Sequence, residues 1–303
     1  MFFEGRKILF ISLTRTGSVE YAAALAEKLG YDNLFVIASE ESSSHFKKVD
    51  VALRTYTNKA TFLLQSLTIK KRLSKIINES IGSSANEWIV LFPVFHPWNN
   101  IIANISHEID VQSACVIHDY EMHIGERNKK VEYLQQNLIQ RVGHVIFLTH
   151  FERLKAIDKG LDESKTSVWP HPLLPTSKVN TLIHSKRLKI LYLGRIKKYK
   201  GVELLIEAVS DLDIELLTIA GEGKIDVQED SGIQLINKRL SNSEIDDLLS
   251  NHHVLVLPYI DASQSGILTL GISANIPMII SDLPGLREQI DANAAIWCAP
   301  NVI

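Results

Sequence analysis

The sequence predicts an α/β protein that contains two doubly wound parallel sheets. Short apolar runs alternate with stretches of helical periodicity along the whole chain. The apolar runs are rich in Val, Ile and Leu without polar alternation, which is typical of parallel strands covered on both faces. The alternation is interrupted once, by a proline-bearing stretch at residues 169–187, and then restarts. We therefore expect an amino-terminal domain over residues 1–175 and a carboxy-terminal domain over residues 187–303.

The first half repeats a unit of strand followed by helix. The run KILFISL predicts a buried strand, and the following VEYAAALAEKL places Val19, Ala22 and Ala26 on one helix face. Further strands are expected at WIVLFPV, SACVIHD and HVIFLTH. The segment FERLKAIDKGL then predicts a helix that ends near a glycine, the residue favoured just after helix ends.

The second half shows the same unit more clearly. Strands are expected at LKILYLG, IELLTIAGEG, GIQLIN, HVLVLPY, PMIISD and AAIWCAP. Val202, Leu205 and Val209 form the apolar face of the first helix between them. Ser241 and Glu244 have the spacing of a capping box and predict the start of another helix. SGILTLGISAN and GLREQIDAN predict two more helices, so a second doubly wound sheet follows the first.

Composition and charge limit the classes of function. The formal net charge is −3, so no global attraction to nucleic acid exists and no nucleic-acid partner is expected. The two cysteines, Cys115 and Cys298, lie far apart and form neither a metal-binding pair nor a disulfide framework, which fits a reducing cytoplasm. No apolar run approaches the ~18 residues of a membrane-spanning helix, and the amino terminus does not resemble a signal segment.

One segment leaves a membrane contact open. LTIKKRLSKII carries Lys70, Lys71, Arg72 and Lys75 beside several apolar residues. A helix of this composition could lie on the anionic inner face of the membrane and reach a lipid-linked acceptor. The alternative is a solvated helix packed on its own domain. We therefore expect a cytoplasmic protein and keep a peripheral membrane contact as an alternative.

Two loops that follow predicted strands carry candidate anion-binding groups. Ligands of doubly wound sheets bind beyond the carboxyl ends of the strands. In GRIKKYKG, residues 194–201, Arg195 and Lys200 could reach one anion from two sides. In DASQSGI, the amides of Ser265, Gly266 and Ile267 stand at a predicted helix start, where the helix dipole favours an anion. The two loops together suit a diphosphate, although each alone fits a solvated turn or a simple helix start equally well.

The order and spacing of several motifs resemble glycosyltransferase family 4. These motifs are YLGRIKKYKGVELLIEAV, IAGEG, LSNSEIDDLL, VLVLPY, DASQSGI and SDLPGLRE, and they cover residues 188–290. The resemblance implies the GT-B fold, in which two Rossmann-like domains face each other across a cleft, with the acceptor on the amino-terminal side and the nucleotide sugar on the carboxy-terminal side. It also implies retaining, metal-independent transfer to a saccharide, lipid-linked or protein-linked acceptor. Arg195 and Lys200 would then hold the donor diphosphate and stabilise charge on the leaving phosphate. No cofactor beyond the co-substrate is expected.

The sequence departs from the family at one motif. Many members carry two glutamates spaced as E-x7-E, and Ser263 and Gly271 stand at these positions here. Recognition of the donor sugar would then depend on neighbouring polar groups, for which Asp261, Ser263 and Gln264 are candidates. The family holds the nucleoside base in a region that corresponds to the following four residues: Gly221, Glu222, Lys238 and Arg239.

The amino-terminal half contributes candidates for the transferred sugar and the acceptor. His118 and Asp119 end the strand SACVIHD, where the family often places a histidine that reaches the transferring sugar. A neutral histidine could accept a hydrogen bond from a sugar hydroxyl or help a proton leave the acceptor, and a structural hydrogen bond is the alternative role. Gly17, Ser18 and His123 are expected on the acceptor side.

Two interpretations of the function stay open, with a third more distant. The first is an enzyme that transfers a sugar and helps to build a polysaccharide or glycoconjugate. The second is a non-catalytic glycosyltransferase-like subunit that binds or scaffolds within a glycosylation complex, and the missing glutamates favour it. The third is a nucleotide-sugar-dependent isomerase. Because the sequence stops soon after AAIWCAP, earlier than in most relatives, a homo-oligomer or a partner subunit is also expected.

Overall fold

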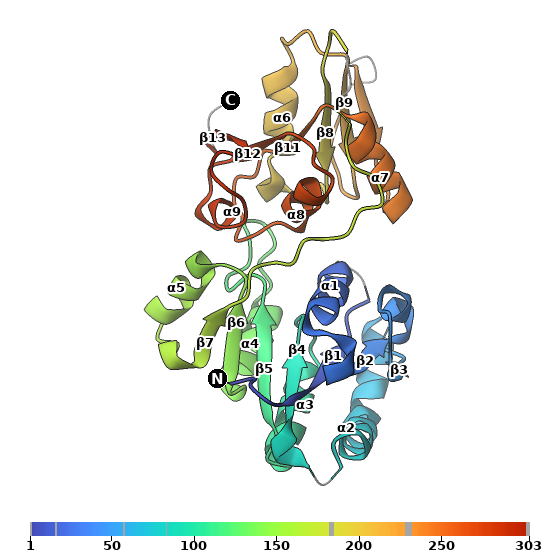
Figure 1. The fold of residues 1–303 in the computed structure, drawn as a ribbon, viewed down its shortest axis with the longest axis vertical. Coiled ribbons are helices and arrows are strands. Elements are labelled where there is room, and N and C mark those ends of the chain that lie inside the picture. The colour runs from blue at the N-terminus through green and yellow to red at the C-terminus, as the bar shows by residue number, and fades with distance from the viewer. Residues whose placement is uncertain are drawn as a thin grey trace. The chain divides into compact units, whose positions relative to one another are not determined.

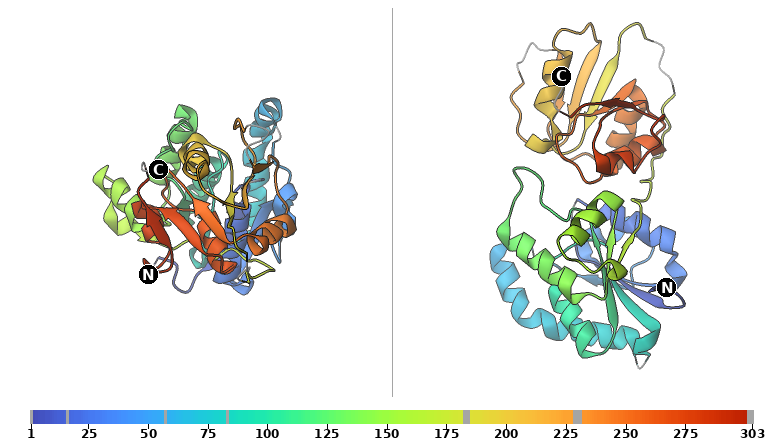
Figure 2. Two further views of the ribbon diagram at one scale, coloured as in Figure 1. Left: turned by 90° about the horizontal axis from the view of Figure 1, so that it is seen from above. Right: turned by 90° about the vertical axis from the view of Figure 1, so that its left-hand side faces the viewer.

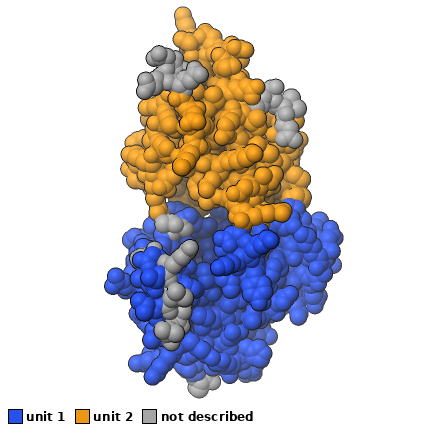
Figure 3. All heavy atoms as spheres, turned by 180° about the vertical axis from the view of Figure 1, so that it is seen from behind, with its two compact units in different colours: residues 1–121, 128–148, 152–172 blue, residues 122–127, 149–151, 173–303 orange. Residues whose placement is uncertain are grey.

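The computed structural model describes residues 2–15, 17–56, 58–82, 84–181, 185–227 and 232–300, which form two compact units (Figure 3). Unit 1 consists of Met1–Glu121, Asn128–Leu148 and Glu152–Pro172. Unit 2 consists of Met122–Arg127, Thr149–Phe151 and Leu173–Ile303. The two short segments of unit 2, residues 122–127 and 149–151, come from the part of the sequence that we assigned to the amino-terminal domain.

Unit 1 contains a seven-stranded sheet in the order β3-β2-β1-β4-β5-β6-β7, and every pairing of these strands is parallel. The strands are β1 (Lys7–Ser12), β2 (Leu34–Ser39), β3 (Val51–Leu53), β4 (Trp88–Phe92), β5 (Gln112–Ile117), β6 (His144–Phe147) and β7 (Thr166–Val168). The helices are α1 (Val19–Leu29), α2 (Lys59–Ile81), α3 (Asn99–Glu108), α4 (Lys129–Arg141) and α5 (His150–Asp158), of which α5 begins with two residues of unit 2. The order reverses beside β1, as in a doubly wound sheet.

The strands of unit 1 are buried on both faces. In β1, Leu9 and Ile11 belong to one apolar cluster, whereas Ile8 and Phe10 belong to another. Successive side chains of a strand point to opposite faces, so the two clusters lie on the two sides of the sheet. The first cluster includes residues of α2, α3 and α4, and the second includes residues of α1. These helices cover the two faces of the sheet (Figure 2). The continuous apolar runs in the sequence therefore arise from burial on both sides.

Unit 2 contains a six-stranded parallel sheet in the order β10-β9-β8-β11-β12-β13 (Figure 1). The strands are β8 (Lys189–Leu193), β9 (Leu216–Ala220), β10 (Ile233–Ile236), β11 (Val254–Leu257), β12 (Met278–Ser281) and β13 (Ile296–Cys298). The helices are α6 (Val202–Val209), α7 (Asn242–Asn251), α8 (Gly266–Ser273) and α9 (Pro284–Arg287). The direction of winding reverses between β8 and β11, so the crevice expected at such a switch point lies beyond the ends of these two strands.

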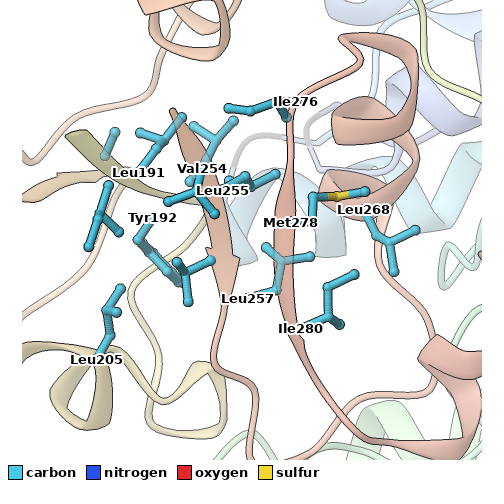
Figure 4. Close-up of a cluster of buried hydrophobic side chains, with 14 of the residues drawn as sticks. Leu191, Tyr192, Leu205, Val254, Leu255, Leu257, Leu268, Ile276, Met278 and Ile280 are labelled. Atoms are coloured by element: carbon cyan, nitrogen blue, oxygen red, sulfur yellow. The ribbon is translucent and has the colours of Figure 1, made fainter. Parts of the chain in front are cut away.

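One apolar core holds unit 2 together. The close-up in Figure 4 shows residues from β8, β11, β12 and the helices meeting in it, among them Leu191, Leu255, Met278 and Leu268. Burial of such aliphatic side chains stabilises the fold by ~1.5–3 kcal/mol each relative to exposure.

The predicted fold class is confirmed, and most predicted elements form as expected. The capping box of α7 is present, because the Ser241 side chain accepts from the Glu244 amide and the Glu244 side chain accepts from the Ser241 amide. The helix expected over GLREQIDAN is shorter, since α9 ends at Arg287. Within the described ranges, no helix combines the length and the apolar character needed to cross a bilayer.

Candidate functional site

The loop after β8, residues 194–201, is here called the cationic loop. It begins at Gly194, whose φ is +132° and whose amide donates to the carbonyl oxygen of Ala220 at 2.9 Å. It ends at Gly201, whose φ is +64°. A Cβ added at Gly201 would lie 1.9 Å from the carbonyl oxygen of Pro258 in the loop after β11. Glycine is therefore required at Gly201 both by the left-handed backbone and by the close approach of a second loop.

Tyr199 organises the charges of the cationic loop. Its side chain is buried, and its hydroxyl accepts a hydrogen bond from Arg195 Nη2 at 3.3 Å. Lys200 Nζ lies 5.1 Å from the centroid of the same ring. The carbonyl oxygen of Tyr199 accepts from the amide of Ile260 at 2.8 Å, which ties the loop after β8 to the loop after β11. The structure thus brings the two predicted cations to one tyrosine.

A second tyrosine connects Lys200 with the start of α8. Lys200 Nζ lies 3.7 Å from the centroid of the buried Tyr259 ring, a cation–π contact. The Tyr259 hydroxyl lies 3.2 Å from Ser265 Oγ. Ser265 Oγ in turn accepts from the amide of Leu268 at 3.3 Å and so caps α8. Burial raises the pKa of Tyr259 to about 12, so its hydroxyl keeps its proton at neutral pH.

The amides predicted to bind a diphosphate differ in their surroundings. The Ser265 amide already donates to Gln289 Oε1 at 2.6 Å. Gly266 and Ile267 are the first two residues of α8, where amides have no acceptor within the helix. Gln264 Oε1 is buried and has no hydrogen-bond partner among the described residues. This oxygen could accept a hydrogen bond beside the start of α8. An anion at this place would meet the positive end of the α8 dipole.

The positions of the two absent glutamates are filled by packing. Ser263 is buried, and its carbonyl oxygen accepts from Thr149 Oγ1 at 3.3 Å. Gly271 lies in α8 against Leu255 and Met278 (labelled in Figure 4), and a Cβ there would lie 2.6 Å from Met278 Sδ and 2.9 Å from Leu255 Cδ2. Any side chain at Gly271 would require these neighbours to move. The packing around Gly271 therefore leaves no space for the second glutamate of the motif.

The loops after β8 and β9 are joined through their backbones. A Cβ at Gly221 would lie 2.0 Å from the carbonyl oxygen of Gly194, so the two glycines lie in close contact. The carbonyl oxygen of Glu222 accepts from the amide of Ile196 at 2.8 Å. Beyond β10, Lys238 pairs with Glu244 at 2.5 Å, and the side chain of Arg239 is exposed. The assignment of these residues to a nucleoside base stays a prediction.

The segment 122–127 contributes His123 to this part of unit 2. The His123 ring stacks on Tyr199, with centroids 4.3 Å apart and planes inclined by 16°. His123 Nδ1 lies 3.0 Å from Asp261 Oδ2, in the loop after β11. His123 belongs to the unit that carries the cationic loop, and its expected role on the acceptor side stays a prediction. The contacts of His123 with Tyr199 and Asp261 could not be predicted, because these residues are far from His123 in the sequence.

In unit 1, His118 follows β5. Its Nε2 lies 3.1 Å from the carbonyl oxygen of Pro93 and must carry the proton of that hydrogen bond. The edge of the ring contacts Tyr21, with centroids 4.4 Å apart. Burial lowers the pKa of His118, so the ring is neutral at neutral pH. The carbonyl oxygen of the neighbouring Asp119 accepts from Gln135 Nε2 at 2.8 Å, which fixes this strand end to α4.

The other predicted residues of unit 1 lie after β1. Gly17 has φ +82°, and Ser18 stands at the N-cap of α1 without a capping hydrogen bond from its side chain. Their expected role on the acceptor side stays a prediction. Throughout the described part of the chain, no group of three or more His, Cys, Asp or Glu side chains could hold a metal ion.

Several important residues were not predicted from the sequence. Tyr199 and Tyr259 were visible in the two anion-binding loops, but only the structure shows that they position Lys200. Glu126 was not predicted either, and its Oε1 lies 3.3 Å from Lys197 Nζ and 3.8 Å from Arg195 Nη1. No spacing in the sequence connects Glu126 with these cations, because the chain completes three strands between them.

Comparison with known proteins gives a partial family match and a complete fold match. Residues 187–302 match the sequence model of the family described as glycosyl transferases group 1. No curated protein matches the chain. The Anabaena HepE structure in complex with UDP-glucose is 13% identical, with a TM-score of 0.71 over 97% of this chain and 86% of that one.

Two further structures have the same fold. Sucrose-phosphate synthase from Thermosynechococcus elongatus is 13% identical, with a TM-score of 0.62 over 98% of this chain and 86% of that one. The apo form of the lipopolysaccharide outer core galactosyltransferase WaaB is 14% identical, with a TM-score of 0.61 over 98% and 87%. Residues 187–302 therefore resemble glycosyl transferases group 1, and the chain has the GT-B fold of two doubly wound α/β domains.

Proposed function

We propose that this protein is a glycosyltransferase that moves a sugar from a nucleotide diphosphate sugar to a saccharide, lipid-linked or protein-linked acceptor. The main support is a set of contacts through two tyrosines. Tyr199 contacts Arg195 and Lys200, and Tyr259 contacts Lys200 and Ser265 at the start of α8. These residues follow β8 and β11, the two strands that flank the switch point of unit 2. The family match of this unit and the UDP-glucose bound to the structurally similar HepE support a nucleotide sugar as the ligand.

Each of these groups has a role in the proposed reaction. The bond between the sugar C1 and the donor phosphate breaks, and negative charge accumulates on the leaving diphosphate. Arg195 can bind two oxygens of a phosphate through its planar guanidinium, whereas Lys200 acts as a point charge held by two aromatic rings. The amides that begin α8 add donors without a proton transfer. The orphaned Gln264 Oε1 can accept a hydrogen bond from a donor hydroxyl.

We further propose that transfer retains the anomeric configuration. The motif resemblance in residues 188–290 supports this outcome, and the proton coupling constant of the product's anomeric position measures it directly. A product of inverted configuration would exclude the retaining mechanism. The sugar, the base and the acceptor are best found by screening.

The donor site is tested by removing its two cations. Arg195→Ala or Lys200→Ala should weaken a nucleoside diphosphate by ~1.5–3 kcal/mol each, the range for hydrogen bonds to charged groups. A matched control is Lys198→Ala, which removes the same charge from an exposed position of the cationic loop and should change the affinity little. A thermal-shift screen of nucleotides and nucleotide sugars first identifies a ligand, because binding to the folded state raises its stability. Titration calorimetry then gives the three affinities.

The outcomes separate the two classes of function. Unchanged affinity in both Arg195→Ala and Lys200→Ala would remove the proposed diphosphate site. Donor binding without turnover, across a panel of acceptors, would instead favour a non-catalytic subunit, for which the packed positions Ser263 and Gly271 are the structural argument. Turnover that falls with both alanine substitutions supports the enzyme.

A further inference from the structure

The carboxylate of Glu126 contacts two cations of the cationic loop. Its Oε1 lies 3.3 Å from Lys197 Nζ and 3.8 Å from Arg195 Nη1. The Glu126 side chain is 23% exposed, whereas those of Arg195 and Lys197 are 62% and 44% exposed. The anion is thus more covered than the cations that it contacts. All three residues belong to unit 2.

The backbone of residues 122–127 turns so that Glu126 is held in place. The amide of Glu126 donates to the carbonyl oxygen of His123 at 3.0 Å, which closes a four-residue turn. Gly125, at the third position of this turn, has φ +82°, as type II turns require. The sequence His-Ile-Gly-Glu therefore places the side chains at the two ends of the turn close to each other.

His123 anchors the other end of the turn. Its ring stacks on Tyr199, and its Nδ1 lies 3.0 Å from Asp261 Oδ2. Tyr199 is the residue whose hydroxyl accepts from Arg195, so both ends of the turn contact the same small group of residues. The contact of Glu126 with the cations is therefore part of a docked segment with several specific contacts.

We propose that Glu126 is an internal competitor of the donor diphosphate. This proposal rests on the proposed function, because it requires that Arg195 and the cationic loop bind the diphosphate. A carboxylate and a phosphate carry the same sign of charge and use the same donors of Arg and Lys. When the diphosphate binds, either the Glu126 carboxylate moves away from the cations, or the two negative charges repel each other in the complex. Glu126 thereby lowers the affinity for the donor and for the released nucleoside diphosphate.

The size of the effect follows from the exposure of the ion pairs. Exposed ion pairs contribute little, whereas a partly covered carboxylate beside a dianionic ligand adds repulsion. We expect Glu126→Gln to increase the affinity for a nucleoside diphosphate about 3- to 10-fold at low salt. The difference should shrink as ionic strength rises, because salt screens charges that solvent reaches.

The experiment compares three proteins by titration calorimetry with inorganic pyrophosphate and with a panel of nucleoside diphosphates. They are the unaltered chain, Glu126→Gln and the control Glu121→Gln. Glu121 directly precedes the segment and pairs with Lys159, so its substitution removes the same net charge away from the cationic loop. The proposal is supported if Glu126→Gln binds the probes more tightly than the unaltered chain does and Glu121→Gln does not. Melting temperatures verify folding, and Glu126→Ala is the second variant if the amide disturbs the turn.

The remaining outcomes overturn one proposal or the other. If neither the unaltered chain nor Glu126→Gln binds any probe, the proposed donor site itself fails. If both bind equally, or if Glu126→Gln binds more weakly, the donor site stands and Glu126 is a supporting residue. If Glu121→Gln increases the affinity as much as Glu126→Gln, the effect is one of net charge and the competitor role is wrong.

Discussion

His118 makes structural contacts in unit 1 and is also a candidate for contact with the transferred sugar. Its ring is partly buried, donates from Nε2 to the carbonyl oxygen of Pro93 and contacts Tyr21. Burial lowers its pKa, so it enters any reaction as a neutral imidazole. The resemblance to the family suggests contact with the transferred sugar. The catalytic role stays a prediction, and it and the structural role predict different behaviour of one variant.

The His118→Ala variant distinguishes these roles. If His118 acts on the sugar during transfer, the variant should bind the nucleoside diphosphate nearly as before and lose ~10²–10⁴ of turnover, the range for a positioned proton-transfer group. If its role is structural, the melting temperature should fall and the loss of turnover should follow the unfolded fraction. Turnover and melting temperature are measured on the same preparation. A fully folded and fully active variant would eliminate the catalytic assignment.

At the scale of elements, the cationic loop depends on its contact with the loop after β11. Gly201 makes this contact possible, because a Cβ would collide with the carbonyl oxygen of Pro258. Gly201→Ala should therefore destabilise the fold by ~2–5 kcal/mol, the sum of left-handed strain in Ala and of overpacking. It should also weaken diphosphate binding in the folded fraction, because Lys200 precedes Gly201 directly. Thermal and chemical unfolding measure the first effect and calorimetry the second.

The matched control is Gly160→Ala. Gly160 follows α5 with φ +94°, and its amide donates to the carbonyl oxygen of Ile157 at 2.8 Å, as in a helix C-cap. Nothing lies within 4 Å of a Cβ at this position. The control therefore carries the left-handed strain alone, ~1–2 kcal/mol. Equal destabilisation by the two substitutions would show that the contact with Pro258 is unimportant.

At the scale of the whole molecule, the prediction concerns the metal. The proposed site neutralises the diphosphate with Arg195, Lys200 and helix amides, which perform the task that Mg²⁺ performs in other enzymes. We expect transfer to continue at an unchanged rate in excess chelator. The assay compares turnover with and without chelator, and adds Mg²⁺ or Mn²⁺ afterwards. If chelation abolished turnover and a metal restored it, metal-independent transfer would be wrong.

The sequence by itself determined the fold class and the main anion-binding candidates. Local signals were sufficient for these, because hydrophobic periodicity, glycine positions and capping residues act over a few neighbours. The capping box at Ser241 and the strands β8 and β11 follow from such signals. Arg195 and Lys200 are candidates because they stand in the loop that follows β8.

Only the tertiary structure decided how these residues are assembled. Tyr259 meets Lys200 because β8 and β11 are neighbours in the sheet, a pairing across residues distant in sequence. Glu126 and His123 reach the cationic loop because residues 122–127 leave the preceding strand and pack with unit 2. The space at Gly271 is filled by Leu255 and Met278 for the same reason. Such contacts depend on chain topology and packing, and no local pattern in the sequence encodes them.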